Sequence, residues 1–162
     1  MTGMPYNASM YEPAGVGFGE IVMAANAVQL LLATLVLVLL TLVVGLAMLT
    51  SRVREMRARR IHPQSVPTAA TMAAKLEHTQ AADNFRNLFE TPVLFYALVA
   101  IALGLDHVPA WLSLGAWVYV GLRVLHSLIH CTYNTVYHRF AVFLLSLALL
   151  QGLWIAFVVE LI

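Results

Sequence analysis

Charged and amide side chains gather in residues 83–92, at the start of an apolar stretch. On a helix, Arg86 and Glu90 are four residues apart and Asn87 and Glu90 are three apart, so the three side chains share one face. Polar groups are costly in an apolar environment, so they must pair, face the interior of a bundle or bind a ligand. Pro92 lacks the N–H that would continue the helix, which predicts a kink beside them. This segment is the strongest candidate for a functional site.

A second set of polar side chains follows helical spacing between residues 119 and 137. Arg123, His126 and His130 lie three and four residues apart, which places them on one helix face. The flanking tyrosines on that face are Tyr119, Tyr133 and Tyr137. The two histidines could hold one metal ion, with Glu90 as a third ligand. Two nearby arginines would repel the cation, and no adjacent segment supplies a third histidine, so no metal site is predicted.

The composition is that of an integral membrane protein. Of 162 residues, 61% are hydrophobic and only 10% are charged, and the mean hydropathy is +0.83. Soluble domains carry about 25% charged residues. The single cysteine, Cys131, excludes an internal disulfide and a cysteine-based zinc site. Nucleic-acid binding is not expected, because membrane topology accounts for the basic residues.

Four stretches are long and apolar enough to cross a bilayer: residues 21–50, 85–105, 111–133 and 140–162. The first is about 45 Å long as a helix, against a hydrocarbon core of about 30 Å, so it must tilt or protrude. Residues 1–20 are expected to form a separate non-cytoplasmic tail, and residues 21–162 a single domain. The alanine-rich residues 69–82, capped by Thr68 or Thr71, are expected to extend the second span as one helix.

The basic residues set the expected topology. Seven of the nine Lys and Arg lie between residues 52 and 86, which places this first loop in the cytoplasm. Both termini are then non-cytoplasmic, in either a bacterial inner membrane or the endoplasmic reticulum. The later connections are short, which predicts an antiparallel four-helix bundle, an all-α fold. Most loop arginines are expected to face solvent or lipid headgroups, with Arg52 and Arg54 the exceptions.

This topology brings polar side chains to one depth at the cytoplasmic end of the bundle: Arg54, Arg86, Asn87, Glu90, Arg123, His126, His130 and Arg139. One interpretation is a network of ion pairs, from Arg86 and Arg123 to Glu90, that only sets the helix register. Against it, the cations outnumber the single buried carboxylate. The excess predicts a site for an anionic ligand.

The pattern resembles the MAPEG family, membrane-associated proteins of eicosanoid and glutathione metabolism that include microsomal glutathione transferases and prostaglandin E synthase. The resemblance covers about residues 52–154. It rests on three motifs: Arg86-Asn87-x2-Glu90-x-Pro92-x2-Phe95, Arg123-Val124-x-His126, and Arg139 at the start of the last span. It implies a homotrimer in contact with membrane lipids, with glutathione bound between subunits in a cleft that faces the cytoplasm.

The resemblance also implies roles for individual residues. Asn87 and Glu90 would hold the peptide and amino end of glutathione, and Arg54 and Arg86 its carboxylates. The cleft would be lined by Arg123, His126 and His130. Arg139 would be the catalytic residue, since an arginine beside a thiol of pKa about 8.5 favours the reactive thiolate.

Five positions depart from the family pattern. His126 and His130 stand where the leukotriene-type enzyme has tyrosines and prostaglandin E synthase has a histidine and then a tyrosine. Asp83 replaces an arginine found in several catalytic members, and Phe140 and Phe143 replace hydroxyl-bearing residues. Thiol activation is thereby left to Arg139. Two hypotheses follow: a glutathione-dependent transferase or peroxidase acting on lipophilic electrophiles or lipid hydroperoxides, or a non-catalytic lipid-binding or accessory subunit of a membrane complex.

Overall fold

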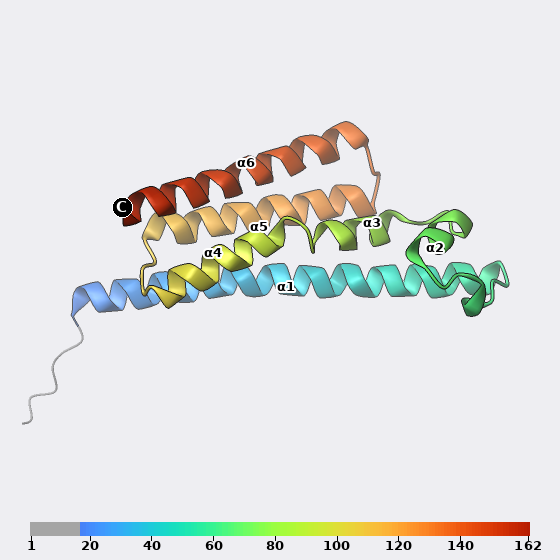
Figure 1. Ribbon diagram of the computed structural model, residues 1–162, viewed down its shortest axis with the longest axis horizontal. Coiled ribbons are helices and arrows are strands. Elements are labelled where there is room, and N and C mark those ends of the chain that lie inside the picture. The colour runs from blue at the N-terminus through green and yellow to red at the C-terminus, as the bar shows by residue number, and fades with distance from the viewer. Residues whose placement is uncertain (1–16) are drawn as a thin grey trace, which may run out of the picture.

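The computed structural model describes residues 17–162, and within that range every regular element is helical (Figure 1). The elements in chain order are α1 (Phe18–Ala58), the short 3-10 helix η2 (Pro63–Ser65), α2 (Ala69–Lys75), α3 (Gln80–Asn87), α4 (Pro92–Gly104), α5 (Ala110–Cys131) and α6 (Val136–Leu161). Most of the predicted tail lies outside the described residues. Its last three residues belong to α1, which begins at Phe18.

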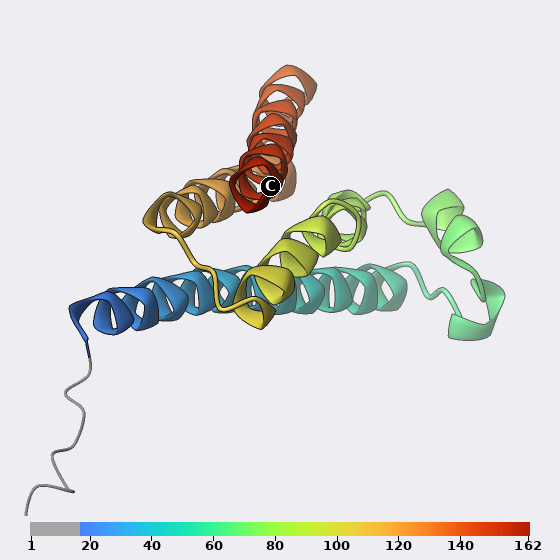
Figure 2. The ribbon, with the colours of Figure 1, turned by 60° about the vertical axis from the view of Figure 1, so that its left-hand side comes forward.

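Four helical segments have the length and apolar composition needed to cross a membrane, namely Gly19–Ala58, Gln80–Gly104, Ala110–Cys131 and Val136–Leu161. They run antiparallel, which confirms the predicted all-α four-helix architecture (Figure 1). Helix α5 is the most buried of the four. It packs against α1 on one side and α6 on the other, and Figure 2 shows α6 turned away from α1.

Helix α1 is longer than the predicted span, because it continues through the basic residues to Ala58. The predicted first span, residues 21–50, therefore ends eight residues before the helix does. Arginine and methionine are good helix formers, so charge alone does not end a helix that has left the hydrocarbon. The helix ends where Arg60 takes a left-handed conformation with φ of 54°, and the Ile61 N–H donates to the Met56 carbonyl at 2.9 Å. The end of α1 is thus a rigid extension rather than a loose loop.

The predicted single helix over residues 69–82 is divided. Thr68 caps α2 as expected, accepting a hydrogen bond from the Thr71 N–H at 3.2 Å, but α2 ends at Lys75. The Glu55 carboxylate of α1 accepts hydrogen bonds from the backbone N–H groups of Glu77 at 2.7 Å and His78 at 3.2 Å. This carboxylate holds those N–H groups outside a helix, and α3 then begins at Gln80.

The kink predicted at Pro92 is present as a complete break. Helix α3 ends at Asn87, residues 88–91 form a turn, and α4 begins at Pro92. Glu90 therefore lies in the turn. The predicted single helix face carrying Arg86, Asn87 and Glu90 does not form, since the i,i+4 relation requires an unbroken helix.

Helices α5 and α6 are in close contact at a glycine. A Cβ atom on Gly115 would collide with Leu153, whereas one on Gly121 in the same helix would meet no heavy atom within 4 Å. Replacing Gly115 with alanine is therefore expected to force the buried Leu153 side chain out of its position, at a cost of about 1–3 kcal/mol. Gly121→Ala is the matched control, because both changes gain the same helix propensity.

The measurement is the melting temperature of both variants in detergent. Gly115→Ala should melt below the wild type and Gly121→Ala at or above it. Equal melting temperatures for the two variants would contradict this close contact.

Candidate functional site

A cavity of about 360 Å³ lies between the end of α3, the end of α5 and the start of α6. Its lining includes four of the predicted site residues: Asn87, His126, His130 and Arg139. The short connection between α5 and α6 brings Arg139 back beside the two histidines. The remaining lining residues are Asp83, Val136, Phe140 and Phe143, so the cavity has a polar side and an apolar side.

Arg139 links both histidines, and its bonds define which ring nitrogens carry protons. The His126 Nδ1 atom lies 3.1 Å from the Arg139 carbonyl oxygen, and a carbonyl only accepts, so Nδ1 is the donor. Arg139 Nη1 donates to His130 Nε2 at 2.9 Å and to Asn134 Oδ1 at 2.8 Å. His130 is therefore neutral with its proton on Nδ1, whereas the bond of His126 shows only that its Nδ1 carries a proton. In the neutral form of His126 the lone pair is on Nε2.

Several buried polar atoms in this region lack a hydrogen-bond partner. Arg123 is 0% exposed, and its Nη2 donates to the Asn87 carbonyl at 3.1 Å, but Nε and Nη1 have no partner within residues 17–162. The same is true of His126 Nε2 and His130 Nδ1, on side chains that are each 2% exposed. Buried polar groups are costly unless they are paired. The region therefore presents unused donors and one unused acceptor.

The ion pairs expected from Arg86 and Arg123 to Glu90 do not form. In the described part of the chain, the ion pairs join Arg59 to Glu55 and Glu77, and His107 to Glu160. Glu90 is exposed in the turn that precedes α4, and no ion pair within residues 17–162 joins it to Arg123 or Arg86. Arg123 instead lies 5.7 Å from the centre of the Phe143 ring, as a cation–π contact. Arg123 is therefore a buried cation with no carboxylate within ion-pair distance in the described part of the chain.

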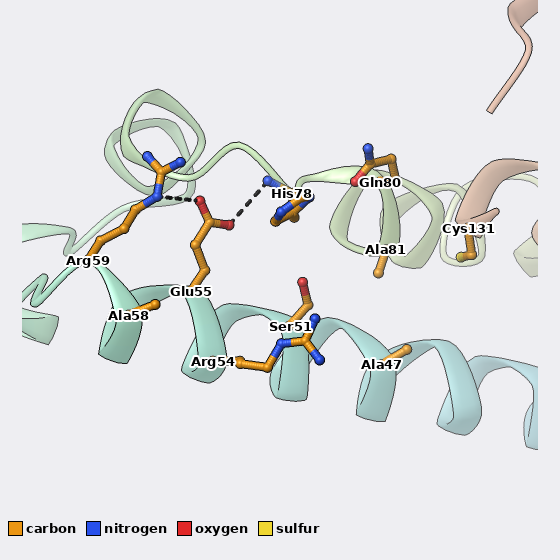
Figure 3. Close-up of a pocket in the computed structure, with 10 residues that line it drawn as sticks. All are labelled: Ala47, Ser51, Arg54, Glu55, Ala58, Arg59, His78, Gln80, Ala81 and Cys131. Atoms are coloured by element: carbon orange, nitrogen blue, oxygen red, sulfur yellow. Dashed lines mark hydrogen bonds and ion pairs between the residues drawn. The ribbon is translucent and has the colours of Figure 1, made fainter. Parts of the chain in front are cut away.

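The structure divides the eight predicted residues into three sets. It brings together Asn87, Arg123, His126, His130 and Arg139. Arg86 and Glu90 are exposed side chains that do not line this cavity. Arg54 lines a different cavity of about 480 Å³, between α1, α3 and the end of α5 (Figure 3). A single chain therefore does not place Arg54 beside Arg139.

Three polar residues that position the site were not singled out from the sequence. Glu55 fixes the start of α3, as Figure 3 shows for its bonds to Arg59 and His78. Asn84 is fully buried and ties α3 to α5, accepting from Ser127 Oγ at 3.4 Å and donating to Cys131 Sγ at 3.4 Å. Asn134 holds Arg139. The only available signal was that Glu55 is the lone acid among five arginines.

No group of three His, Cys, Asp or Glu side chains in residues 17–162 is placed to hold a metal ion. The two histidines that suggested such a site each use one ring nitrogen in a bond with Arg139. Nor does Glu90 approach them as a third ligand, since it does not line their cavity.

Four apolar antiparallel helices with a polar cavity at one end define an integral membrane protein of the helical-bundle class. The family model for the MAPEG family matches residues 30–159, and the chain belongs to that family. No curated protein and no solved structure matches the chain. The protein is thus a membrane protein of the eicosanoid and glutathione metabolism kind.

Proposed function

We propose that the protein binds glutathione at the cavity between α3, α5 and α6. We further propose that it uses glutathione as co-substrate for a membrane transferase or peroxidase acting on a lipophilic electrophile or lipid hydroperoxide. The observation that carries this proposal is the buried Arg123 guanidinium, which has two unused donors and no carboxylate within ion-pair distance in residues 17–162. It does not line the cavity itself but contacts two residues that do, Asn87 and Phe143. Glutathione brings two carboxylates, and charge-assisted bonds to arginine are among the strongest available to such groups.

The unused atoms fit a peptide ligand that carries both donors and acceptors. His126 Nε2 can accept from an amide, ammonium or thiol group, and His130 Nδ1 can donate to a carbonyl or carboxylate. Arg123 and Arg139 offset the net negative charge of glutathione. This assignment gives every buried unpartnered nitrogen in the region a complementary group on the ligand.

Arg139 is proposed to lie beside the sulfur. Its bonds to His130 and Asn134 both use Nη1, which leaves the other guanidinium nitrogens available to the ligand. A nearby cation in a partly buried site favours the thiolate over the thiol. In transfer, the thiolate forms a C–S bond to the electrophile and the leaving group departs with its electron pair. In hydroperoxide reduction, the thiolate attacks the terminal peroxide oxygen, the O–O bond breaks, and the alcohol leaves after taking up a proton. The sulfur is then a sulfenic acid, and a second glutathione thiol displaces water from it to form the disulfide.

The proposal extends to assembly and topology. Arg54, Arg86 and Glu90 are exposed on a single chain, as residues would be if they contact a ligand across a subunit boundary. We therefore propose a homotrimer with the cleft between subunits. Residues 21–162 would form one domain, with the first loop cytoplasmic and both termini on the opposite side. A bacterial inner membrane and the endoplasmic reticulum both suit this topology.

The accessory hypothesis is favoured by one feature of the cavity. Its lining contains no Ser, Thr or Tyr hydroxyl, and Val136, Phe140 and Phe143 give it an apolar wall. Such a wall suits a lipid chain as well as a lipophilic electrophile. The second candidate function is therefore a lipid-binding or accessory subunit that does not activate a thiol.

Calorimetry of the purified protein in detergent, with glutathione and with S-methylglutathione, separates these functions. Both ligands are expected to bind, because the proposed carboxylate and amide contacts do not involve the sulfur. Only glutathione should then show the ultraviolet absorbance of a bound thiolate near neutral pH. Binding of glutathione without thiolate would favour the accessory function, and no binding of either ligand would contradict the proposal.

A further inference from the structure

The arginines near the end of α1 divide between two faces. Arg59 turns inward, with its Nε 3.1 Å from a Glu55 oxygen and its Nη2 2.6 Å from a Glu77 oxygen. Arg57 and Arg60 are exposed, and neither has a carboxylate partner within residues 17–162. Arg59 forms ion pairs with both nearby carboxylates, Glu55 and Glu77. The charges of Arg57 and Arg60 on the other face of the helix end therefore stay unpaired within residues 17–162.

Arg57 and Arg60 line a hollow of about 480 Å³ on that face. Its other lining residues are Val53, Met56, Ile61, His62 and Pro63. A second hollow, lined by Thr50, Val53, Arg54 and Arg57, adjoins it in the direction of the membrane span. The two share Val53 and Arg57, so an apolar path leads from the arginine pair toward the exposed Leu49.

The backbone that carries this pair is well defined and partly strained. Arg60 adopts φ of 54°, a left-handed conformation that glycine usually supplies where a helix ends. Its N–H donates to the Arg57 carbonyl at 3.3 Å, and the following Ile61 N–H donates to Met56. Glycine would adopt this backbone conformation at a lower conformational free energy than arginine. The presence of arginine here therefore indicates that its side chain has a function.

The position of the pair along α1 indicates which ligand it meets. Arg57 is seven residues beyond Thr50, the end of the apolar run, or about 10 Å along the helix. Each headgroup layer is about 5–7.5 Å thick, so the backbone of Arg57 lies close to its outer edge, and the long arginine side chain can reach back to the phosphates. Guanidinium groups match the oxygens of a phosphate in charge and geometry.

We propose that Arg57 and Arg60 bind the phosphate headgroup of an anionic phospholipid, with one acyl chain lying along Val53 and Leu49. The phosphate-binding hollow is separate from the cavity that holds Arg139, because the two share no lining residue. Arg54 lines only the adjoining hollow along the acyl chain and is not part of the proposed phosphate site. The inference therefore does not depend on glutathione binding. It makes the end of α1 a lipid-specific anchor rather than a general basic surface.

Native mass spectrometry of delipidated protein can test this, using phosphatidylglycerol and phosphatidylcholine with identical acyl chains. The wild type is expected to prefer phosphatidylglycerol by about tenfold or more, since a basic residue near the surface contributes about fivefold. The double variant Arg57→Gln/Arg60→Gln should lose this preference. The control Arg52→Gln/Lys75→Gln changes the net charge equally and alters no residue that lines the hollow, so it should keep the preference.

A single variant separates binding from folding. Arg60→Gly relieves the left-handed strain, so it should keep or raise the melting temperature while weakening phosphatidylglycerol binding. Equal loss in the control pair, or equal affinity for both lipids in the wild type, would overturn the proposal. Displacement of the lipid by millimolar inorganic phosphate would instead identify a free-anion site and also overturn it.

Discussion

Replacing Arg123 with methionine is expected to weaken glutathione binding by about 100-fold or more while raising the melting temperature of the ligand-free protein. The guanidinium is fully buried, and two of its nitrogens have no partner in the described structure. Removing one member of a buried charge pair costs about 3–5 kcal/mol, and here the ligand carboxylate would lose its partner. Without ligand, the same cation is uncompensated, so an apolar side chain of similar volume should stabilise the bundle.

Calorimetry measures the affinity of each variant for glutathione, and thermal unfolding without glutathione measures its melting temperature. Arg123→Lys serves as a second variant, because it keeps the charge but loses the planar fork, and its affinity should be intermediate. Unchanged affinity in Arg123→Met would show that the ligand does not contact this charge. A large fall in melting temperature would show that the bond from Arg123 to the Asn87 carbonyl, at 3.1 Å, is mainly structural.

The second large effect is expected at Arg139. Arg139→Leu should raise the pKa of the bound thiol, since a neighbouring cation favours the thiolate and its removal favours the protonated form. Activity at neutral pH should fall by about tenfold for each unit of that rise, and the pH profile should move to higher pH. Glutathione affinity should change much less, because the proposed carboxylate and amide contacts are made elsewhere.

Turnover measured against pH for the wild type, Arg139→Leu and Arg139→Lys tests this role. The lysine variant should fall between the other two, since it keeps the charge without the fork. Asn134→Ala is the control: it removes a neutral partner of Nη1 and leaves the cation in place. An unchanged pH profile in Arg139→Leu would exclude Arg139 from thiol activation and make His126 or His130 the next candidate. Loss of the folded protein would show a structural role.

Much of this architecture follows from the sequence alone. A long apolar stretch in a bilayer must be helical to satisfy its own backbone, and connections such as residues 105–109 and 132–135 are too short for anything but antiparallel neighbours. The meeting of His126, His130 and Arg139 was predictable for the same reason. Two residues one helical turn apart and a third just beyond a tight return must lie close together.

The tertiary structure decided which polar groups pair. Arg86, Asn87 and Glu90 match an i,i+4 pattern, but the turn at residues 88–91 carries Glu90 outward and leaves Arg123 without the expected partner. The end of α2 depends on Glu55, which bonds N–H groups more than twenty residues away. Helical periodicity describes neighbours within one element. A buried charge, in contrast, depends on which groups other elements bring within about 4 Å, and only the packed chain determines that.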